Sequence, residues 1–226
     1  MLNPLELTGR ARTHVREDPE LSCALHPQVL PALAALAAAA RADGIEVAVV
    51  SGYRDLKRQV SIWNAKLRGE RPLLDRDGRR IERSLLSERD AVDTLLLWSA
   101  LPGASRHHWG SDLDVIDRAA LPQGQTPQLT AQEFASEGVF ARLSAWLTRH
   151  ADRFGFFRPY ATYSGGVMPE PWHLSYAEVA VPALSSLTVE ILAEAIAVTS
   201  MDARDQVLAR LPELYERFVL VRPPER

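Results

Sequence analysis

The sequence predicts an α+β fold built as a single domain. Helical and strand patterns are mixed along the chain without a regular strand–helix–strand repeat, and no stretch of sequence is repeated. A length of 226 residues suits one sizeable domain, and 46% hydrophobic residues supply enough apolar material for a packed core. The 24% of charged residues is ordinary for a globular protein, so composition gives no sign of disorder.

Helical periodicity appears in several separated segments. Gly44 and Gly69 stand where the first two segments should end, and Ser87 with Asp90 opens the third in the manner of a capping box. A further segment is interrupted near Gly138. The predicted helices cover residues 28–42, 54–67, 87–101, 130–154, 188–197 and 202–218.

Three segments have strand character. Residues 45–50 are rich in β-branched side chains and predict a buried strand. Residues 111–117 alternate polar and apolar side chains, which puts Asp112 and Asp114 on one face of a strand. The aromatic segment 154–176 contains a Gly-Gly turn signal and predicts a hairpin.

Charge and cysteine content exclude several kinds of protein. A formal net charge of -3 does not favour nucleic-acid binding. The arginine-rich stretch 68–83 is interleaved with acidic residues, so we expect a solvated loop or hairpin, with a contact surface for an anionic partner as the alternative. Because Cys23 is the only cysteine, the chain can form no internal disulfide, and any metal must be held by histidines and carboxylates.

The sequence also bears on location. No apolar run reaches the length needed to span a bilayer, so no membrane partner is expected. The first residues lack the pattern of a signal peptide, which favours a cytoplasmic protein, or a periplasmic one if a leader has been removed. We expect residues 222–226 to form a frayed tail. The sequence does not indicate an oligomeric state.

The stretch SRHHWGSDLDV, residues 105–115, concentrates candidate metal ligands. A catalytic zinc site needs three protein ligands and one open position, and here the ligands should be imidazoles and a carboxylate. His107 and Asp114 lie seven residues apart across Gly110, a spacing that suits a loop turning into a strand. Composition alone does not choose between His107 and the adjacent His108.

A third ligand must come from another segment, and His173 offers it. Glu170 precedes this histidine by three residues, and Pro171 biases Glu170 away from helical conformation. The pair should therefore converge through a turn, unlike the helical His-Glu-x-x-His device. Arg54, which follows the end of the predicted strand 45–50, adds a cation that is costly to bury without a partner.

Three motifs together resemble one group of zinc peptidases, the VanY-like and LdcB-like D-alanyl-D-alanine carboxypeptidases of bacterial cell walls. The pattern Ser-x-His-x-x-Gly-x-Ala-x-Asp is matched by Ser105, His107, Gly110 and Asp114. The pattern Glu-x-Trp-His is matched by Glu170, Trp172 and His173. The pattern Ser-Gly-Tyr-Arg, with a Gln five residues beyond the Arg, is matched by Ser51, Gly52, Tyr53, Arg54 and Gln59. The match covers roughly residues 7–176, and it breaks at Asp112, where the group usually has Ala.

The resemblance implies a fold and a metal. A small antiparallel sheet flanked by helices should carry one Zn2+ per chain, bound by His107, Asp114 and His173, as in the LAS-type metallopeptidases. A single metallopeptidase domain would then span residues 1–226, with a catalytic core of about residues 7–180 and a C-terminal helical extension of about residues 186–220.

The resemblance also implies roles. Glu170 would transfer protons in catalysis, and Arg54 would bind substrate and polarise the scissile carbonyl or stabilise its oxyanion. His108 becomes a residue that supports the ligands or the fold. Asp112 either faces inward and accepts a hydrogen bond from a ligand imidazole, or faces outward into solvent. The remaining expected substrate-binding residues are Tyr53, Gln59, Ser105 and Trp172.

The implied substrate is a peptidoglycan stem peptide or muropeptide that ends in D-alanine. We expect an L,D-carboxypeptidase that removes this residue from tetrapeptides during cell-wall recycling. A D,D-carboxypeptidase and a D-Ala-D-Ala dipeptidase are the enzymatic alternatives. A catalytically inactive, zinc-containing peptide-binding module is the alternative from another functional class.

Overall fold

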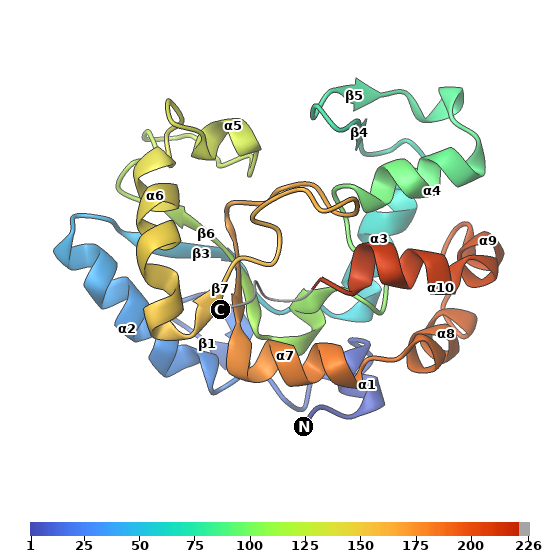
Figure 1. The fold of residues 1–226 in the computed structure, drawn as a ribbon, viewed down its shortest axis with the longest axis horizontal. Coiled ribbons are helices and arrows are strands. Elements are labelled where there is room, and N and C mark those ends of the chain that lie inside the picture. Colours follow the sequence, from blue (N-terminus) through green and yellow to red (C-terminus); the bar gives the residue numbers. More distant parts are fainter. Residues whose placement is uncertain (222–226) are drawn as a thin grey trace.

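A four-stranded antiparallel sheet organises the chain, which confirms the predicted α+β class (Figure 1). The computed structural model describes residues 1–221. The order of strands in the sheet is β3-β6-β8-β7. These strands are β3 (Val47–Ser51), β6 (Asp112–Asp117), β7 (Phe156–Phe157) and β8 (His173–Tyr176). Two small hairpins add β1 (Arg16–Asp18) with β2 (Cys23–Leu25), and β4 (Leu73–Leu74) with β5 (Arg80–Ile81).

Strand β6 lies inside the sheet, and all six of its residues are buried. Its alternation is as predicted: Leu113 and Val115 are fully buried in the core, and Asp112 and Asp114, which alternate with them, lie on the opposite face. In the antiparallel register with β8, Asp114 is paired with His173. The pairing of two strands that are distant in sequence therefore places two candidate ligands side by side.

Strand β3 corrects the prediction of a buried strand. It pairs with β6 on one side only, so it forms an edge of the sheet. Ala48 is buried, whereas Val50 is 42% exposed. The run of β-branched residues therefore reflects a half-buried edge strand, because β-branched side chains suit a pleated surface whether or not both faces are covered.

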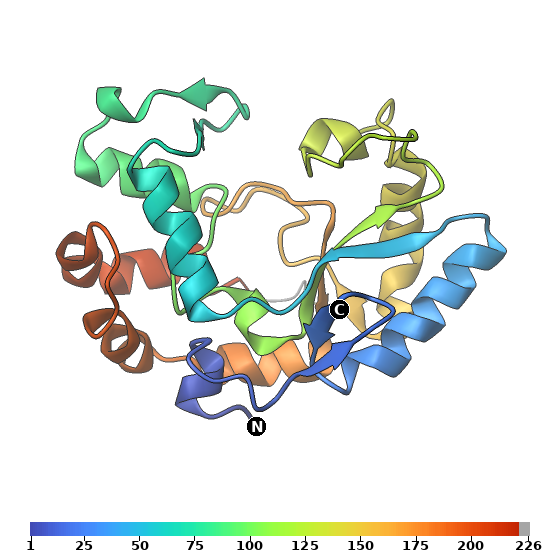
Figure 2. The same cartoon turned by 180° about the vertical axis from the view of Figure 1, so that it is seen from behind.

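Helices pack around the sheet in two groups, each with its own hydrophobic cluster (Figures 1 and 2). The group that packs with the sheet contains α2 (Val29–Ala42), α5 (Ala131–Phe134) and α6 (Ala141–His150). The other group contains α1 (Pro4–Leu7), α3 (Leu56–Leu67), α4 (Glu88–Leu96), α8 (Val189–Ala197), α9 (Arg204–Ala209) and α10 (Leu211–Leu214). Helix α7 (Ala177–Ser186) contributes to both clusters. Short helical turns are η1 (Arg83–Leu85), η2 (Arg106–Trp109), η3 (Ala151–Phe154) and the π-helical η4 (Tyr215–Val219).

One predicted capping signal sets the start of a helix as expected: Ser87 accepts a hydrogen bond from the backbone N–H of Asp90 and so caps α4. The start of α3 was not predicted exactly, because Asp55 accepts a hydrogen bond from the backbone N–H of Arg58 and caps the helix there. Helix α4 ends at Leu96, earlier than the predicted residue 101, and residues 98–101 line a cavity.

Two predicted hairpins are present, but one has an unexpected connection. The arginine-rich stretch forms the β4–β5 hairpin, in which Arg79 pairs with Asp77 over 2.9 Å at the surface. Strands β7 and β8 pair as predicted for segment 154–176. Their connection is the long loop 158–172, so the Gly-Gly pair does not form a tight turn between them.

The C-terminal helices pack against the rest of the chain. The Trp63 indole on α3 donates a hydrogen bond to the carbonyl of Asp202 over 3.0 Å, and Arg68 pairs with the Asp202 carboxylate over 2.7 Å. Among the described residues no single helix is long and apolar enough to cross a membrane; α7 and α8, bent by 78°, pass that test only as a pair, by length and composition. The expected frayed tail, residues 222–226, lies outside the described residues.

Candidate metal centre and active site

A cavity of about 290 Å³ lies where the two hydrophobic clusters meet. Its apolar walls include Leu96, Leu101 and Val219 from one cluster and Trp172 from the other. Its polar lining is formed by Arg54, Lys66, Ser99, Ser105, Arg106, His107, Asp114, Gln128, Tyr160, Glu170 and His173. Most of the predicted site residues therefore share one cavity.

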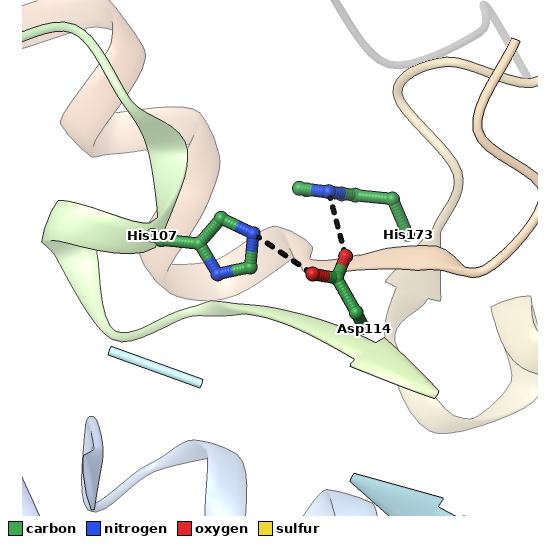
Figure 3. Close-up of side chains that lie close together, drawn as sticks. All are labelled: His107, Asp114 and His173. Atoms are coloured by element: carbon green, nitrogen blue, oxygen red, sulfur yellow. Dashed lines mark ion pairs between the residues drawn. The ribbon is translucent and has the colours of Figure 1, made fainter. Parts of the chain in front are cut away.

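His107, Asp114 and His173 line this cavity as a buried group. Figure 3 shows both imidazoles beside the carboxylate of Asp114. One donor atom from each lies within 4.8 Å of the other two. His107 Nε2 is 3.5 Å from Asp114 Oδ2, and His173 Nδ1 is 3.3 Å from Asp114 Oδ1. Two imidazole nitrogens thus converge on the two oxygens of one carboxylate.

The outer nitrogen of each imidazole has a hydrogen-bond partner of its own. His107 Nδ1 lies 2.8 Å from the Gly52 carbonyl, and His173 Nε2 lies 3.0 Å from Asp112 Oδ1. With a proton on each outer nitrogen, the inner nitrogens present lone pairs toward Asp114. Buried Asp114 Oδ1 accepts no well-oriented hydrogen bond from residues 1–221. An unsatisfied carboxylate oxygen beside two inward lone pairs fits a divalent metal such as zinc.

Burial and charge act differently on the two imidazoles. Burial lowers the pKa of His107 to about 4, so this ring is neutral at neutral pH, the form that binds metals. Burial also acts to lower the pKa of His173, but contacts with Asp112, Asp114 and Glu170 outweigh it and raise that pKa well above its ordinary value. The carboxylates around His173 therefore favour a positive charge at this point.

Local backbone geometry sets the position of His107. It lies on the short turn η2, which ends at Gly110 in the left-handed region with a φ of 66°. A Cβ atom at Gly110 would lie 2.4 Å from Val15 Cγ1 and 2.9 Å from the backbone nitrogen of His26. Glycine is thus required both for the turn and for the close approach of another segment.

Asp112 adopts the inward of its two predicted orientations. It is fully buried and accepts hydrogen bonds from His173 Nε2, from Arg106 Nε over 2.9 Å and from Ser111 Oγ over 2.5 Å. Burial acts to raise the pKa of Asp112, but Arg106 and His173 together lower it by more, so the pKa lies below its ordinary value. The carboxylate is therefore ionised while it orients the His173 ring.

Arg106 is a site residue that the sequence analysis missed. Its guanidinium is buried, donates to Ser175 Oγ over 2.6 Å and lies 4.9 Å from the centre of the Trp109 ring. The pairing with Asp112 neutralises the second negative charge near the ligands. A buried aspartate on a strand needs a cationic partner. The inward-facing alternative for Asp112 was therefore the feature of the sequence that could have indicated one.

His108 does not face the ligand group. Its Nδ1 lies 2.6 Å from the carbonyl of Arg54, and its Nε2 accepts a hydrogen bond from the Gly103 N–H over 3.2 Å. Both ring nitrogens are used in fixing backbone, and the residue is fully buried. The structure therefore distinguishes the two adjacent histidines: His107 points to the cavity and His108 supports the segment that carries Arg54.

Glu170 lies beside the ligand group at the rim of the cavity. Its Oε2 is 3.4 Å from His173 Nδ1, and its side chain is 15% exposed. The backbone N–H of His173 donates to the Glu170 carbonyl over 3.0 Å, which is the predicted turn.

Tyr160 is a second residue of the cavity that no sequence pattern had indicated. Its backbone carbonyl accepts a hydrogen bond from the backbone N–H of Glu170. Burial raises the pKa of its phenol to about 12, so the hydroxyl keeps its proton.

Arg54 reaches the cavity from the segment between β3 and α3. Its guanidinium donates to Gln59 Oε1 over 2.9 Å and to Ser51 Oγ over 3.2 Å. It makes no pair with the adjacent Asp55, which caps α3 instead. Burial lowers the pKa of Arg54, and the negative charges of Asp114 and Glu170, which line the same cavity, offset part of this effect.

Comparison with known proteins agrees with this geometry. The family model described as D-alanyl-D-alanine carboxypeptidase, VanY, matches residues 22–179. The chain belongs to the VanY family. The match includes every residue of the cavity's ligand group and both Arg54 and Glu170.

Individual relatives extend the comparison. An uncharacterized protein of Haemophilus influenzae is 32% identical over 122 residues, which cover 53% of this chain and 93% of that protein. The D,D-pentapeptidase VanY of a VanB-type vancomycin resistance cassette, solved with Zn(II), is 25% identical with a TM-score of 0.53, covering 76% of this chain and 83% of that chain. The LD-carboxypeptidase LdcB is 27% identical with a TM-score of 0.50, covering 79% of this chain and 72% of that chain.

The expected substrate-binding residues of this VanY-family chain are placed unequally. Ser105 and Trp172 line the cavity, and the buried Ser105 hydroxyl has no hydrogen-bond partner within residues 1–221. Gln59 is fully buried behind Arg54, with its amide donating to the Ala100 carbonyl over 2.7 Å. Tyr53 lies outside the cavity, and its hydroxyl donates to the Ala11 carbonyl over 3.2 Å. Contact with substrate stays a prediction for Ser105 and Trp172, whereas Gln59 is placed to act through Arg54 and Tyr53 to hold the N-terminal segment.

Proposed function

We infer that this chain is a zinc metallocarboxypeptidase that removes a C-terminal D-alanine from peptidoglycan stem peptides. The observation that carries the proposal is the position of Glu170, with its carboxylate 3.4 Å from His173 Nδ1 at the edge of a three-residue donor group. Three protein donors with an adjacent acid at an open cavity are typical of a catalytic zinc site. A purely structural site is usually closed by a fourth protein ligand.

The residues divide the chemistry of peptide hydrolysis among them. Zinc held by His107, Asp114 and His173 would supply a water of lowered pKa and a Lewis acid for the scissile carbonyl. Glu170 takes a proton from the attacking water and delivers it to the leaving amine. The rim position of Glu170, buried on one side and open to the cavity on the other, suits a group that exchanges protons with substrate.

Arg54 is assigned to the carbonyl oxygen of the substrate. Its guanidinium is fixed by Gln59 and Ser51 before substrate arrives, so little reorganisation is needed when negative charge develops on that oxygen. The unsatisfied hydroxyl of Ser105 is available to donate a hydrogen bond to the peptide. Trp172 packs against Phe134, with ring centres 5.6 Å apart, and provides a rigid apolar wall.

The proposal also specifies which peptide bond is cleaved. We assign the L,D bond of tetrapeptides in cell-wall recycling, in a cytoplasmic enzyme; the likeness to the LD-carboxypeptidase LdcB supports this choice. The likeness to the D,D-pentapeptidase VanY supports the alternative, a D,D-carboxypeptidase acting on pentapeptides. A D-Ala-D-Ala dipeptidase is the third enzymatic reading. An inactive zinc-containing peptide-binding module is disfavoured because Glu170 and Arg54 accompany the complete donor group.

Matched muropeptides test the proposal. The zinc-loaded protein is incubated with a muramyl tetrapeptide and with the corresponding pentapeptide, and the products are identified by mass spectrometry. Loss of one D-alanine from the tetrapeptide supports L,D activity. Loss from the pentapeptide alone moves the assignment to D,D activity. Free D-Ala-D-Ala is incubated in parallel, and its hydrolysis to two molecules of D-alanine identifies a dipeptidase. Stoichiometric zinc with no product from any of these peptides would establish the binding module instead.

A further inference from the structure

Lys66 is a cation in the active-site cavity that the proposed chemistry does not use. It lies in the last turn of α3, and its Nζ donates a hydrogen bond to Ser99 Oγ over 2.6 Å. Within residues 1–221 no carboxylate oxygen lies within 4.0 Å of this ammonium. Arg68, two residues further along, pairs with Asp202 over 2.7 Å at the surface. The more buried of these two cations is therefore the one without an acidic partner.

A half-buried ammonium without a counter-ion is energetically unfavourable. Burial lowers the pKa of Lys66, the charge of Glu170 offsets part of this effect, and the charge of Arg54 adds to it. Neutral hydrogen-bond partners compensate for lost hydration less well than an anion does. The position is thus maintained at a cost that an incoming anion would remove.

The helix geometry places Lys66 apart from Arg54. Gln59 and Lys66 are seven residues apart on α3, two helical turns, so both side chains project from the same face with a rise of about 10 Å between them. Gln59 contacts the Ala100 carbonyl and holds Arg54, whereas Lys66 contacts the neighbouring Ser99. One helix face therefore positions two separate cations at the same cavity, Arg54 through its contact with Gln59 and Lys66 directly.

The free hydrogen-bond donors at this position match a carboxylate. Lys66 uses one of its three N–H donors on Ser99 Oγ and keeps two. Because Ser99 accepts this bond, its own O–H remains available to donate. A carboxylate with two oxygens can accept from the ammonium and the hydroxyl at once.

We propose that Lys66 and Ser99 form a carboxylate-binding subsite that selects the substrate of this enzyme. The inference rests on the proposed peptidase function and adds a specificity residue to it. Two carboxylates of a stem peptide share the required chemistry: the terminal α-carboxylate of the leaving residue, and the side-chain carboxylate of an acidic or diamino-diacid residue within the peptide. Lys66 is a substrate-binding specificity residue, because it binds a part of the substrate that is not transformed.

Kinetics on matched peptides test the subsite and identify its ligand. The tetrapeptide is compared with two derivatives, one amidated at its C-terminus and one amidated at the internal side-chain carboxylate. We expect Lys66→Met to raise KM by about 10-fold to 100-fold on the unmodified tetrapeptide, with kcat nearly unchanged. Lys66→Arg keeps the charge and should restore most of the affinity. Lys57→Met is the matched control, since Lys57 is the chain's other lysine and is exposed on the same helix.

Amidation reveals which carboxylate is bound. On the derivative that lacks the recognised carboxylate, the wild type should show the raised KM and Lys66→Met should cause no further loss. If the C-terminal amide gives this result, the subsite binds the α-carboxylate. If the side-chain amide gives it, the subsite binds the internal carboxylate. An equal KM change on all three peptides, or no change on any, overturns the subsite. Ser99→Ala provides a second variant with a smaller expected KM change should Lys66→Met unfold.

Binding measured without turnover separates this inference from the proposed function. The zinc-loaded Glu170→Gln protein is titrated with the tetrapeptide by calorimetry, with and without Lys66→Met. Weaker binding in the double variant supports the subsite even if the wild type proves inactive on this peptide. Unchanged binding contradicts the subsite while leaving the hydrolase assignment intact.

Discussion

His173 Nε2 lies 3.0 Å from Asp112 Oδ1, and this contact makes Nδ1 the nitrogen that faces Asp114. The carboxylate of Asp112 is itself held by Arg106, which donates a hydrogen bond to Oδ1 over 2.9 Å. Where the resembling motif usually has Ala, this chain thus has an acid that selects the tautomer and orientation of a ligand. The Asp112 carboxylate thus contacts the outer nitrogen of the His173 imidazole, and the inner nitrogen of the same ring faces the metal position.

Asp112→Asn should weaken zinc binding by about 10-fold to 100-fold, because the substituted amide orients the His173 ring less well. Competition with a chromogenic chelator measures the affinity. Ser111→Ala is the control: it removes one hydrogen bond to Asp112 but leaves the carboxylate, so the affinity should fall much less. Equal affinity in the wild type and the Asp112→Asn protein would contradict the assigned role.

Glu170→Gln should lower kcat by about 100-fold to 10,000-fold, because the amide cannot accept the proton of the attacking water. Zinc content, measured by elemental analysis, should stay that of the wild type, since Glu170 lies beside the donor group without belonging to it. A variant that loses its metal together with its activity would instead make Glu170 a ligand.

Gln59 should act on catalysis through Arg54. Arg54→Lys is expected to lower kcat by about 100-fold or more, because a lysine cannot keep the two fixed hydrogen bonds and still meet the oxyanion. Gln59→Leu fills the same buried space without fixing Arg54, so it should lower kcat with little change in KM. A rise in KM alone would place Gln59 in direct contact with substrate.

Gly110→Ala should destabilise the fold and displace His107. Its positive φ and the 2.4 Å approach of Val15 Cγ1 both oppose a Cβ atom, with an expected loss of about 1–3 kcal/mol in the free energy of unfolding, measured with urea. Gly124→Ala is the matched control: its φ is 78°, yet nothing lies within 4 Å of the Cβ position. The excess loss at Gly110 isolates the steric contact, and equal losses would show that backbone strain alone is responsible.

Local patterns predict much of the candidate site. The alternation in β6 was sufficient to place Asp112 and Asp114 on one face, since side-chain period in a strand is two. Pro171 was sufficient to predict a turn between Glu170 and His173. Spacing could not separate His107 from His108, because the direction of each ring depends on the exact rotation of η2.

The residues that sequence reasoning missed are those brought in by long-range packing. Lys66 reaches the cavity because α3 packs beside the segment that follows α4. Arg106 is the exception, since it lies only six residues before Asp112 and pairs with it across the turn between η2 and β6. Tyr160 comes from the long β7–β8 connection, whose course no local signal indicates. The edge position of β3 was missed for the same reason: pairing partners lie outside the segment whose pattern was read.

Zinc titration of the metal-free protein, with the released D-alanine counted at each step, tests the central claim most directly. We expect no release from the muramyl tetrapeptide without zinc, a rise on addition of zinc and a plateau at one zinc per chain. His173→Ala should remain inactive and bind no stoichiometric zinc. Release that continues undiminished after the metal has been removed would show that this is not a zinc peptidase. A fully zinc-loaded protein that frees no D-alanine from either the tetrapeptide or the pentapeptide would show that it is not a D-alanine carboxypeptidase.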